Sequence, residues 1–215
     1  MSLGRRFPLL VAVLLIAVGF ALSWFLDRAA VDQSLKIAEQ QNIGLARTLA
    51  STLRLDIRAF RSDARTMDVE ALRSDPKAAA FRTALQVNLT GLPIAKIKIY
   101  DAGGLTIFST ERAQIGEDKS GNAGFRRALA GGIATELTFR NKFSAFDAEI
   151  VHRNMLSSYV PVEDSSGKID TVFEIYQDVT ELLDELRQAR LTRDAAVLGS
   201  LALVYVLVLV LRRRS

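Results

Sequence analysis

The sequence predicts an α+β protein in which a long N-terminal helix packs on a five-stranded antiparallel sheet, between two transmembrane helices. Two uncharged apolar stretches, residues 7–26 and 195–211, lie near the ends of the 215-residue chain. Between them, apolar residues first recur at helical spacing over residues 27–67 and later alternate with polar ones from residue 94 onward. Helices are therefore expected before strands, with a membrane span on each side.

The first apolar stretch is long enough to cross a bilayer, which takes about 20 residues. Trp24 and Phe25, at the end of this stretch, are expected to form an aromatic anchor at the far interface. The alternative is a cleaved signal peptide, because Ala21, Leu22 and Ser23 loosely match a small-x-small cleavage site. The helical pattern continues past Trp24, which favours an uncleaved span.

The basic residues indicate the topology. The chain has 28 Lys and Arg against 24 Asp and Glu, and removing five terminal arginines leaves 23 against 24. By the positive-inside rule both termini are cytoplasmic. We expect a two-pass membrane protein, with a cytoplasmic head and first span at 1–26, an extracytoplasmic domain at 27–194, and a second span and basic tail at 195–215. In a bacterium this is a protein of the inner membrane with a periplasmic or extracellular domain. The five arginines are Arg5, Arg6, Arg212, Arg213 and Arg214.

The outer domain begins with helices. Residues 27–67 read as one long amphipathic helix that continues the first span. A second helix is expected over residues 76–89, with Asp75 as its N-cap and Pro76 at its first position. Gly91, Leu92 and Pro93 end this helical part.

Five strands and one short helix follow. Alternation and turn residues predict strands at 94–100, 105–110, 133–139, 155–162 and 169–177, and a helix at 122–130 that two glycines close. Residues 140–154 carry no clear pattern and are expected to form a long loop or lid.

The last predicted element is a single helix over residues 178–214. Asp178 is expected to cap its first turn and Glu181 to reach back, as in a capping box. Its first half is amphipathic, and its second half is the short second span, whose terminal arginines can reach the interface. The last strand therefore leads directly into a helix that enters the membrane.

Two segments resemble a known family. Residues 158–183, SYVPVEDSSGKIDTVFEIYQDVTELL, are similar to the ending of input domains of membrane histidine kinases and diguanylate cyclases. Residues 125–131, FRRALAG, are similar to the short helix of such domains, and Tyr100, Asp101 and Gly104 resemble their first hairpin. The chain thus resembles a bacterial extracytoplasmic Cache (PAS-like) sensor domain between two transmembrane helices. It departs from the family at Ser157 and Ser158, where related sequences often carry an acid.

The resemblance implies a ligand site on the sheet. In a PAS-like fold one sheet face packs on the long helix and the other faces the pocket. The expected ligand is a small organic anion or an amino acid. Solvated surface charges are the alternative reading for each polar residue. The candidate ligand-binding residues are Lys98, Tyr100, Arg126, Arg127, Arg140, Tyr159, Glu174 and Tyr176.

No catalytic pattern is visible. The only histidine, His152, has no supporting motif, cysteines are absent, and no glycine-rich loop carries the lysine that a nucleotide site needs. We expect no enzyme activity, cofactor, metal site or nucleic-acid partner. The family implies a homodimer and an output domain such as a kinase or cyclase, either beyond residue 215 or in a partner. The expected function is a ligand-binding sensor module; the alternative is a membrane adaptor or assembly protein whose outer domain binds another protein.

Overall fold

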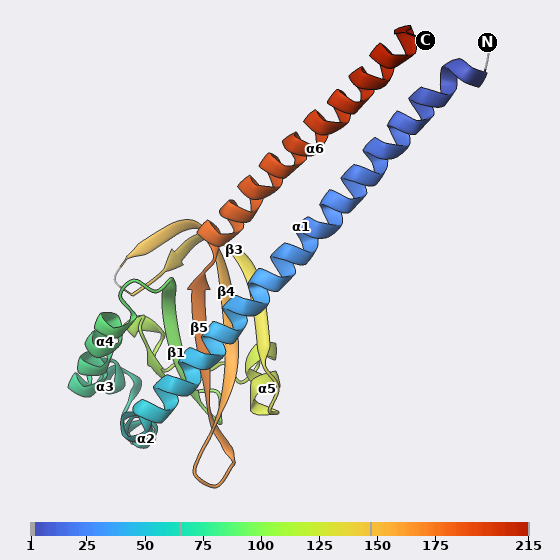
Figure 1. Cartoon of the computed structure of the whole chain (residues 1–215). Coiled ribbons are helices and arrows are strands. Elements are labelled where there is room, and N and C mark those ends of the chain that lie inside the picture. Colours follow the sequence, from blue (N-terminus) through green and yellow to red (C-terminus); the bar gives the residue numbers. More distant parts are fainter. Residues whose placement is uncertain (1–2, 65, 147, 215) are drawn as a thin grey trace. The chain divides into compact units, whose positions relative to one another are not determined.

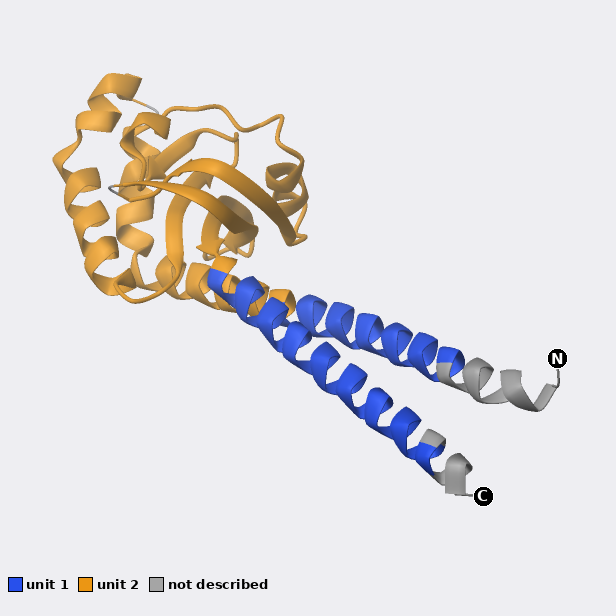
Figure 2. Ribbon diagram, turned by 90° about the horizontal axis from the view of Figure 1, so that it is seen from above, with its two compact units in different colours: residues 1–34, 181–215 blue, residues 35–180 orange. Residues whose placement is uncertain are grey.

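The computed structural model describes residues 3–64, 66–146 and 148–214. It divides into two compact units (Figure 2). One unit contains the outer parts of the first and last helices, residues 1–34 and 181–215, and the other is Leu35–Thr180. The side chains of the five terminal arginines lie outside those that the structure describes.

Two long helices account for the predicted spans. Helix α1 is Leu3–Thr52 and helix α6 is Thr180–Arg214. Their segments Val13–Thr52 and Thr180–Val208 are long and apolar enough to cross a membrane. Almost none of the residues in the most apolar window of each segment is buried, as expected for side chains that face lipid. The expectation of one uninterrupted exit helix is confirmed.

Within the unit formed by these helices, polar side chains join α1 to α6. Arg190 Nη1 lies 3.0 Å from Asp27 Oδ2, and Arg193 Nε donates to Ser23 Oγ over 3.3 Å. The Ser23 hydroxyl also donates to Asp194. Two cations, two carboxylates and a hydroxyl thus form one network with balanced charge at a single level of the helix pair.

The second unit is built on a five-stranded antiparallel sheet with the strand order β2-β1-β5-β4-β3 (Figure 1). This is the expected α+β fold with strands in the expected chain order. The last strand, β5, lies in the centre between the first and fourth. The strands are β1 (Ile94–Asp101), β2 (Thr106–Ser109), β3 (Ala134–Ser144), β4 (Glu149–Glu163) and β5 (Ile169–Asp178).

One face of the sheet carries the main core. Alternate apolar residues of β1 and β5 pack there against α1, α2 (Arg54–Asp63) and α4 (Pro76–Leu89). At about 1.5–3 kcal/mol for each fully buried large side chain, this layer is the main source of stability. Its members include Ile97, Ile99, Phe173 and Ile175 from the sheet and Ile43, Ala46, Phe60 and Phe81 from the helices.

The prediction of one unbroken helix from residue 27 to 67 is wrong. Helix α1 ends at Thr52, and Leu53 has φ −108° and ψ 20° before α2 begins. No Pro or Gly causes this break, and Ile57 and Phe60 beyond it are buried in the same core, so packing on the sheet is the physical reason. A further helix, α3 (Val69–Ser74), was not predicted; Asp68 caps it by accepting a hydrogen bond from the Ala71 N–H at 2.8 Å.

The prediction of a loop or lid at 140–154 is also wrong. Strands β3 and β4 stay paired from Ala134 opposite Tyr159 to Ser144 opposite Glu149. This outer part of the ladder is mostly exposed on both faces. It therefore lacks the apolar alternation that reveals a half-buried strand, and backbone pairing holds it instead.

The other sheet face is covered by helix α5 (Ala123–Leu129), which the sequence predicted. Asn122 caps it by accepting from the Phe125 N–H at 2.9 Å. Gly124 allows the helix to approach the sheet closely, because a Cβ there would lie 2.5 Å from the Tyr159 ring. The α4 cap is also as expected, since Asp75 accepts from the Lys77 N–H at 2.9 Å.

Strand β5 passes directly into α6, and neighbouring segments hold the junction. The Asp178 N–H donates to the Pro93 carbonyl at 2.8 Å, and the Val179 N–H donates to the Asn154 carbonyl at 2.9 Å. The Asp178 carboxylate accepts from the Thr180 N–H at 2.9 Å. The expected capping box is only half formed, since the described contacts include no return bond from Glu181.

Candidate ligand site on the sheet

Glu174 lies at the centre of the sheet face that is opposite α1. Alternation along β5 directs Phe173 and Ile175 to the helix-covered face and Glu174 to the other. Its neighbours in the ladder are Lys98 on β1 and Tyr159 on β4. Only 1% of Glu174 is exposed, so its carboxylate must be satisfied by groups of the protein or of a bound molecule.

Three tyrosines surround this carboxylate. The Tyr100 hydroxyl donates to Glu174 Oε2, and the charge of Glu174 also acts on Tyr159 and Tyr176. Burial, followed by the charge of Glu174, raises the pKa of all three tyrosines above the ordinary value of 10.0. They remain protonated across the physiological pH range.

Two buried lysines accompany the carboxylate. Lys96 and Lys98 are each 3% exposed. Lys98 Nζ lies 3.5 Å from Glu117 Oε2, and Lys96 Nζ lies 4.3 Å from the centre of the Phe143 ring. Burial, followed by the charge of Lys98, lowers the pKa of Lys96 to about 8. Burial also lowers the pKa of Lys98, while the charge of Glu174 opposes both shifts.

Helix α5 covers one side of this face. The Phe125 ring packs edge-on against Tyr100, with ring centres 5.7 Å apart. The Asn122 side chain lies close enough to Tyr159 to affect the pKa of that tyrosine. The cover therefore adds apolar surface and one amide to a face that bears both signs of charge.

The structure places five of the eight predicted residues on one face of the sheet. The other three are exposed at the edge of this group. Arg126 and Arg127 are exposed on α5, and Arg127 Nε donates to the Ile133 carbonyl at 2.9 Å. Arg140 is exposed on β3, and its charge acts on Tyr176. The five that share the sheet face are Lys98, Tyr100, Tyr159, Glu174 and Tyr176.

Lys96 belongs to this group but was not among the predicted site residues. The alternation of β1 places it on the same face as Lys98 and Tyr100, so the signal was present in the sequence. Its burial was not visible there, because Phe143 and Tyr176, whose rings lie near its ammonium group, come from other strands.

The side chains on this face suit a ligand that carries both charges. The two ammonium groups can bind a carboxylate, and Glu174 can accept from an ammonium group. No group of three or more His, Cys, Asp or Glu side chains that could hold a metal occurs among the residues that the structure describes. His152 lies apart from this face, exposed on β4, with its ring 6.4 Å from Phe139.

Comparisons with known proteins give structural likeness only. No family model and no curated protein matches the sequence. Among solved structures, the E. coli DcuS sensor domain is 17% identical, with a TM-score of 0.37, over 56% of this chain and 79% of that chain. The sensor domain of the V. cholerae histidine kinase DctB is 18% identical, with a TM-score of 0.38, over 72% of this chain and 59% of that chain.

The periplasmic domain of RsbU from Chlamydia trachomatis is 18% identical, with a TM-score of 0.39, over 71% of this chain and 55% of that chain. The chain thus spans less than two thirds of the matched DctB and RsbU structures. At this level of likeness, the class of protein follows from the chain itself: an α+β domain with a central antiparallel sheet, flanked in the sequence by two helices that are long and apolar enough to span a membrane.

Proposed function

We propose that this chain is the extracytoplasmic sensor module of a membrane signalling protein. Residues 1–26 form the cytoplasmic head and first span, residues 27–194 the sensor domain, and residues 195–215 the second span and cytoplasmic tail. The excess of arginine at both ends supports this orientation. The module acts on a cytoplasmic output domain or a partner kinase, as a homodimer in a bacterial inner membrane.

One observation carries the proposal: a buried carboxylate, two buried ammonium groups and three tyrosine hydroxyls meet on one face of β5 and its neighbours. Burying so many polar groups costs stability. A function that requires them is therefore the best explanation for their presence. The strand that bears Glu174 ends four residues later at Asp178, and the helix proposed to enter the membrane begins at Thr180. A ligand that binds at Glu174 therefore contacts the strand that is directly connected to α6.

The ligand that fits these charges best is a free amino acid. Its carboxylate would lie against Lys96 and Lys98, and its ammonium group against Glu174. A simple organic acid satisfies the lysines but leaves Glu174 to the tyrosines alone. A ligand can drive a conformational change only through different affinities for two states. We propose that those states differ in how β5 and α6 are held.

Thermal unfolding of the full chain in lipid nanodiscs tests this function. We expect at least one compound from a panel of amino acids and organic acids to raise the melting temperature. Such a ligand increases the free energy of unfolding by RT ln(1 + [L]/Kd). Glu174→Gln and Lys98→Met should abolish the shift, and Lys36→Gln, an exposed lysine of α1 away from the site, should retain it. The proposal fails if no compound shifts the wild type, or if the site variants respond as Lys36→Gln does.

A second candidate function, a membrane adaptor, is favoured by exposed apolar side chains on the edge strand β3. Leu137 and Phe139 share one face and are 42% and 55% exposed. Such residues at a sheet edge can bind another protein. Affinity purification from membranes distinguishes the two functions: a partner retained without ligand by the wild type and lost in Phe139→Ser supports the adaptor.

A further inference from the structure

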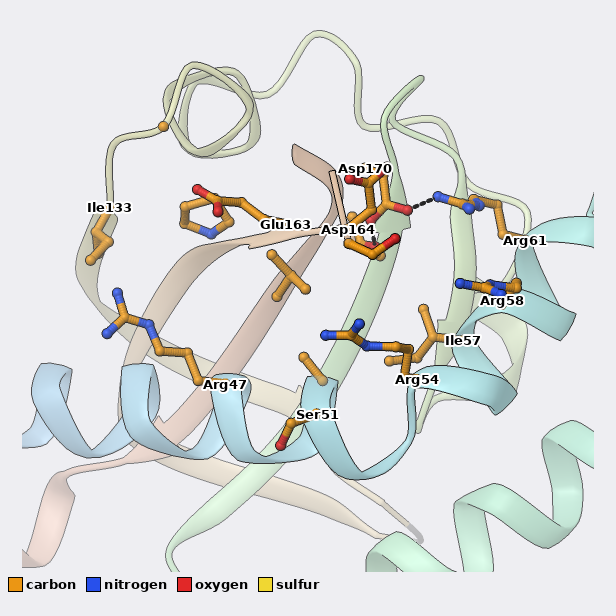
Figure 3. Close-up of a pocket in the computed structure, with 16 residues that line it drawn as sticks. Arg47, Ser51, Arg54, Ile57, Arg58, Arg61, Ile133, Glu163, Asp164 and Asp170 are labelled. Carbon is orange, nitrogen blue, oxygen red and sulfur yellow. Dashed lines mark hydrogen bonds and ion pairs between the residues drawn. The ribbon is translucent and has the colours of Figure 1, made fainter. Parts of the chain in front are cut away.

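A polar cavity lies on the helix-covered side of the sheet, apart from the Glu174 face. It has a volume of about 460 Å³ and lies between α1–α2 and the β4–β5 hairpin (Figure 3). One wall carries four arginines in sequence steps of seven, four and three residues, which keeps them along one side of the broken helix. We call this cavity the arginine cleft, after Arg47, Arg54, Arg58 and Arg61.

The acidic residues of the opposite wall are mostly occupied. Asp170 pairs with Arg61 and accepts from the Thr171 hydroxyl. Asp164 accepts from the Ser166 N–H and hydroxyl at 2.7 and 2.6 Å, which closes its own turn. These hydrogen bonds from Ser166 hold the pKa of Asp164 below its ordinary value of 3.8. Both carboxylates are therefore structural and are not available to the other arginines.

Three arginines of the cleft are left without partners. Within the described residues, Arg47, Arg54 and Arg58 make no hydrogen bond or ion pair, and Figure 3 shows Arg47 and Arg54 extending toward the hairpin. Glu163 is the one lining carboxylate that is also unpaired in the described part of the chain. Asp164 and Asp170 keep their negative charges, so four arginines face three carboxylates and the cleft has an excess of one positive charge.

We propose that the arginine cleft binds a small multivalent oxyanion, a polycarboxylate or a phosphate compound. Guanidinium groups bind carboxylate and phosphate oxygens in pairs. Cavities of about 300–1,000 Å³ suit small molecules. An anion bound beside Arg54 and Arg58, which are one helical turn apart, relieves the repulsion between their charges. Arg61, fixed by Asp170, marks the end of the site.

This site is separate from the one on the Glu174 face and does not depend on it. The cleft is lined by Ala50, Ile57 and Val162, which contact the helix-covered core, whereas Glu174 faces α5. An anion in the cleft joins α1–α2 to the hairpin that leads into β5. The cleft therefore gives the domain a second ligand input on the same strand.

The test is isothermal titration of the full chain in phosphatidylcholine nanodiscs at pH 7.5 and constant ionic strength, with citrate and pyrophosphate as separate probes. We expect one anion per chain. Affinity should fall by at least about fivefold in Arg54→Gln and in Arg58→Gln, because each loses a charged hydrogen-bond donor. Citrate and pyrophosphate distinguish a polycarboxylate site from a phosphate site.

Two further variants keep the test specific. Glu163→Gln should bind the anion more tightly, by about twofold or more, because it removes the unpaired negative charge. Lys36→Gln, which removes a cation of α1 outside the cleft, should bind as the wild type does. The proposal is overturned if neither probe binds, if Arg54→Gln matches Lys36→Gln, or if Lys98→Met on the other sheet face abolishes binding.

Discussion

Replacing Lys96 by methionine is predicted to stabilise the folded domain at pH 7. Lys96 is 3% exposed, and among the described residues it has no carboxylate within ion-pair distance. The fall of its pKa from 10.5 to about 8 corresponds to a cost on the order of 3 kcal/mol, at about 1.4 kcal/mol per pH unit. The contact with the Phe143 ring offsets about 0.5–2 kcal/mol of this. Methionine fills similar volume without charge, so the net gain is on the order of 1–2 kcal/mol.

The pH dependence has a definite sign. Between pH 8 and 10.5 the unfolded chain holds a proton on Lys96 that the folded chain has lost, so stability rises with pH. The lowered pKa of Lys98 acts in the same direction. The tyrosines act oppositely, but only above their ordinary pKa of 10.0. Below pH 10 the lysines therefore dominate among these groups.

Urea unfolding of the full chain in detergent, followed by near-ultraviolet circular dichroism of the buried tyrosines, measures this between pH 7 and 9.5. The free energy of unfolding of the wild type should increase over this pH range. In Lys96→Met it should increase less, because only the contribution of Lys98 remains. Lys36→Gln is the control and should keep the wild-type slope. The reasoning is refuted if Lys96→Met is less stable than the wild type at pH 7, or if its pH slope equals that of the wild type.

Three other predictions concern packing. Phe108→Ala should lower the free energy of unfolding by about 3–5 kcal/mol in the urea assay, because Phe108 is 0% exposed within a cluster of three aromatic rings. Gly124→Ala should cost about 1–3 kcal/mol and change the near-ultraviolet signal, because its Cβ would lie 2.5 Å from the Tyr159 ring. Ser23→Cys combined with Asp194→Cys should form a disulfide in oxidised membranes, because these two side chains are hydrogen-bonded.

Each of these has a matched control. Val87→Ala removes an apolar side chain that is 70% exposed, so it should change stability by less than about 0.5 kcal/mol. The chain has no native cysteine, so cross-linking can be read without background, and Leu22→Cys with Asp194→Cys should react far more slowly. Equal cross-linking of the two pairs, or equal losses for Phe108→Ala and Val87→Ala, would contradict the packing described above.

The sheet and its polar face could be predicted because their signals are local. Alternation in β1 places Ile97 and Ile99 on one face and Lys98 and Tyr100 on the other, and the structure has this arrangement. The pairing of β3 with β4 beyond Phe139 could not be predicted, because that ladder is mostly exposed and its one buried side chain, Phe143, is too little to give an apolar period.

The arginine cleft illustrates a different limit. The spacing from Arg47 to Arg61 was visible in the sequence, but solvated surface charge was the simpler reading. Whether an arginine is paired depends on residues about 100 positions away, such as Asp170 for Arg61. The break at Leu53 likewise follows from packing of Ile57 and Phe60 on the sheet rather than from any local helix breaker.

Strand β5 connects the polar features of the domain. Asp170, Glu174 and Asp178 follow one another at intervals of four residues along this strand. Asp170 pairs with Arg61 of α2 in the arginine cleft, and Glu174 accepts a hydrogen bond from Tyr100 of β1. Asp178 lies 3.6 Å from Arg153 and accepts from the Thr180 N–H in the first turn of α6. The central strand is hydrogen-bonded on both sides, so it moves as a unit with its neighbours and not alone. A ligand that changes the contacts of Asp170 or Glu174 therefore acts on the same hydrogen-bonded strands that position Asp178, at the start of α6.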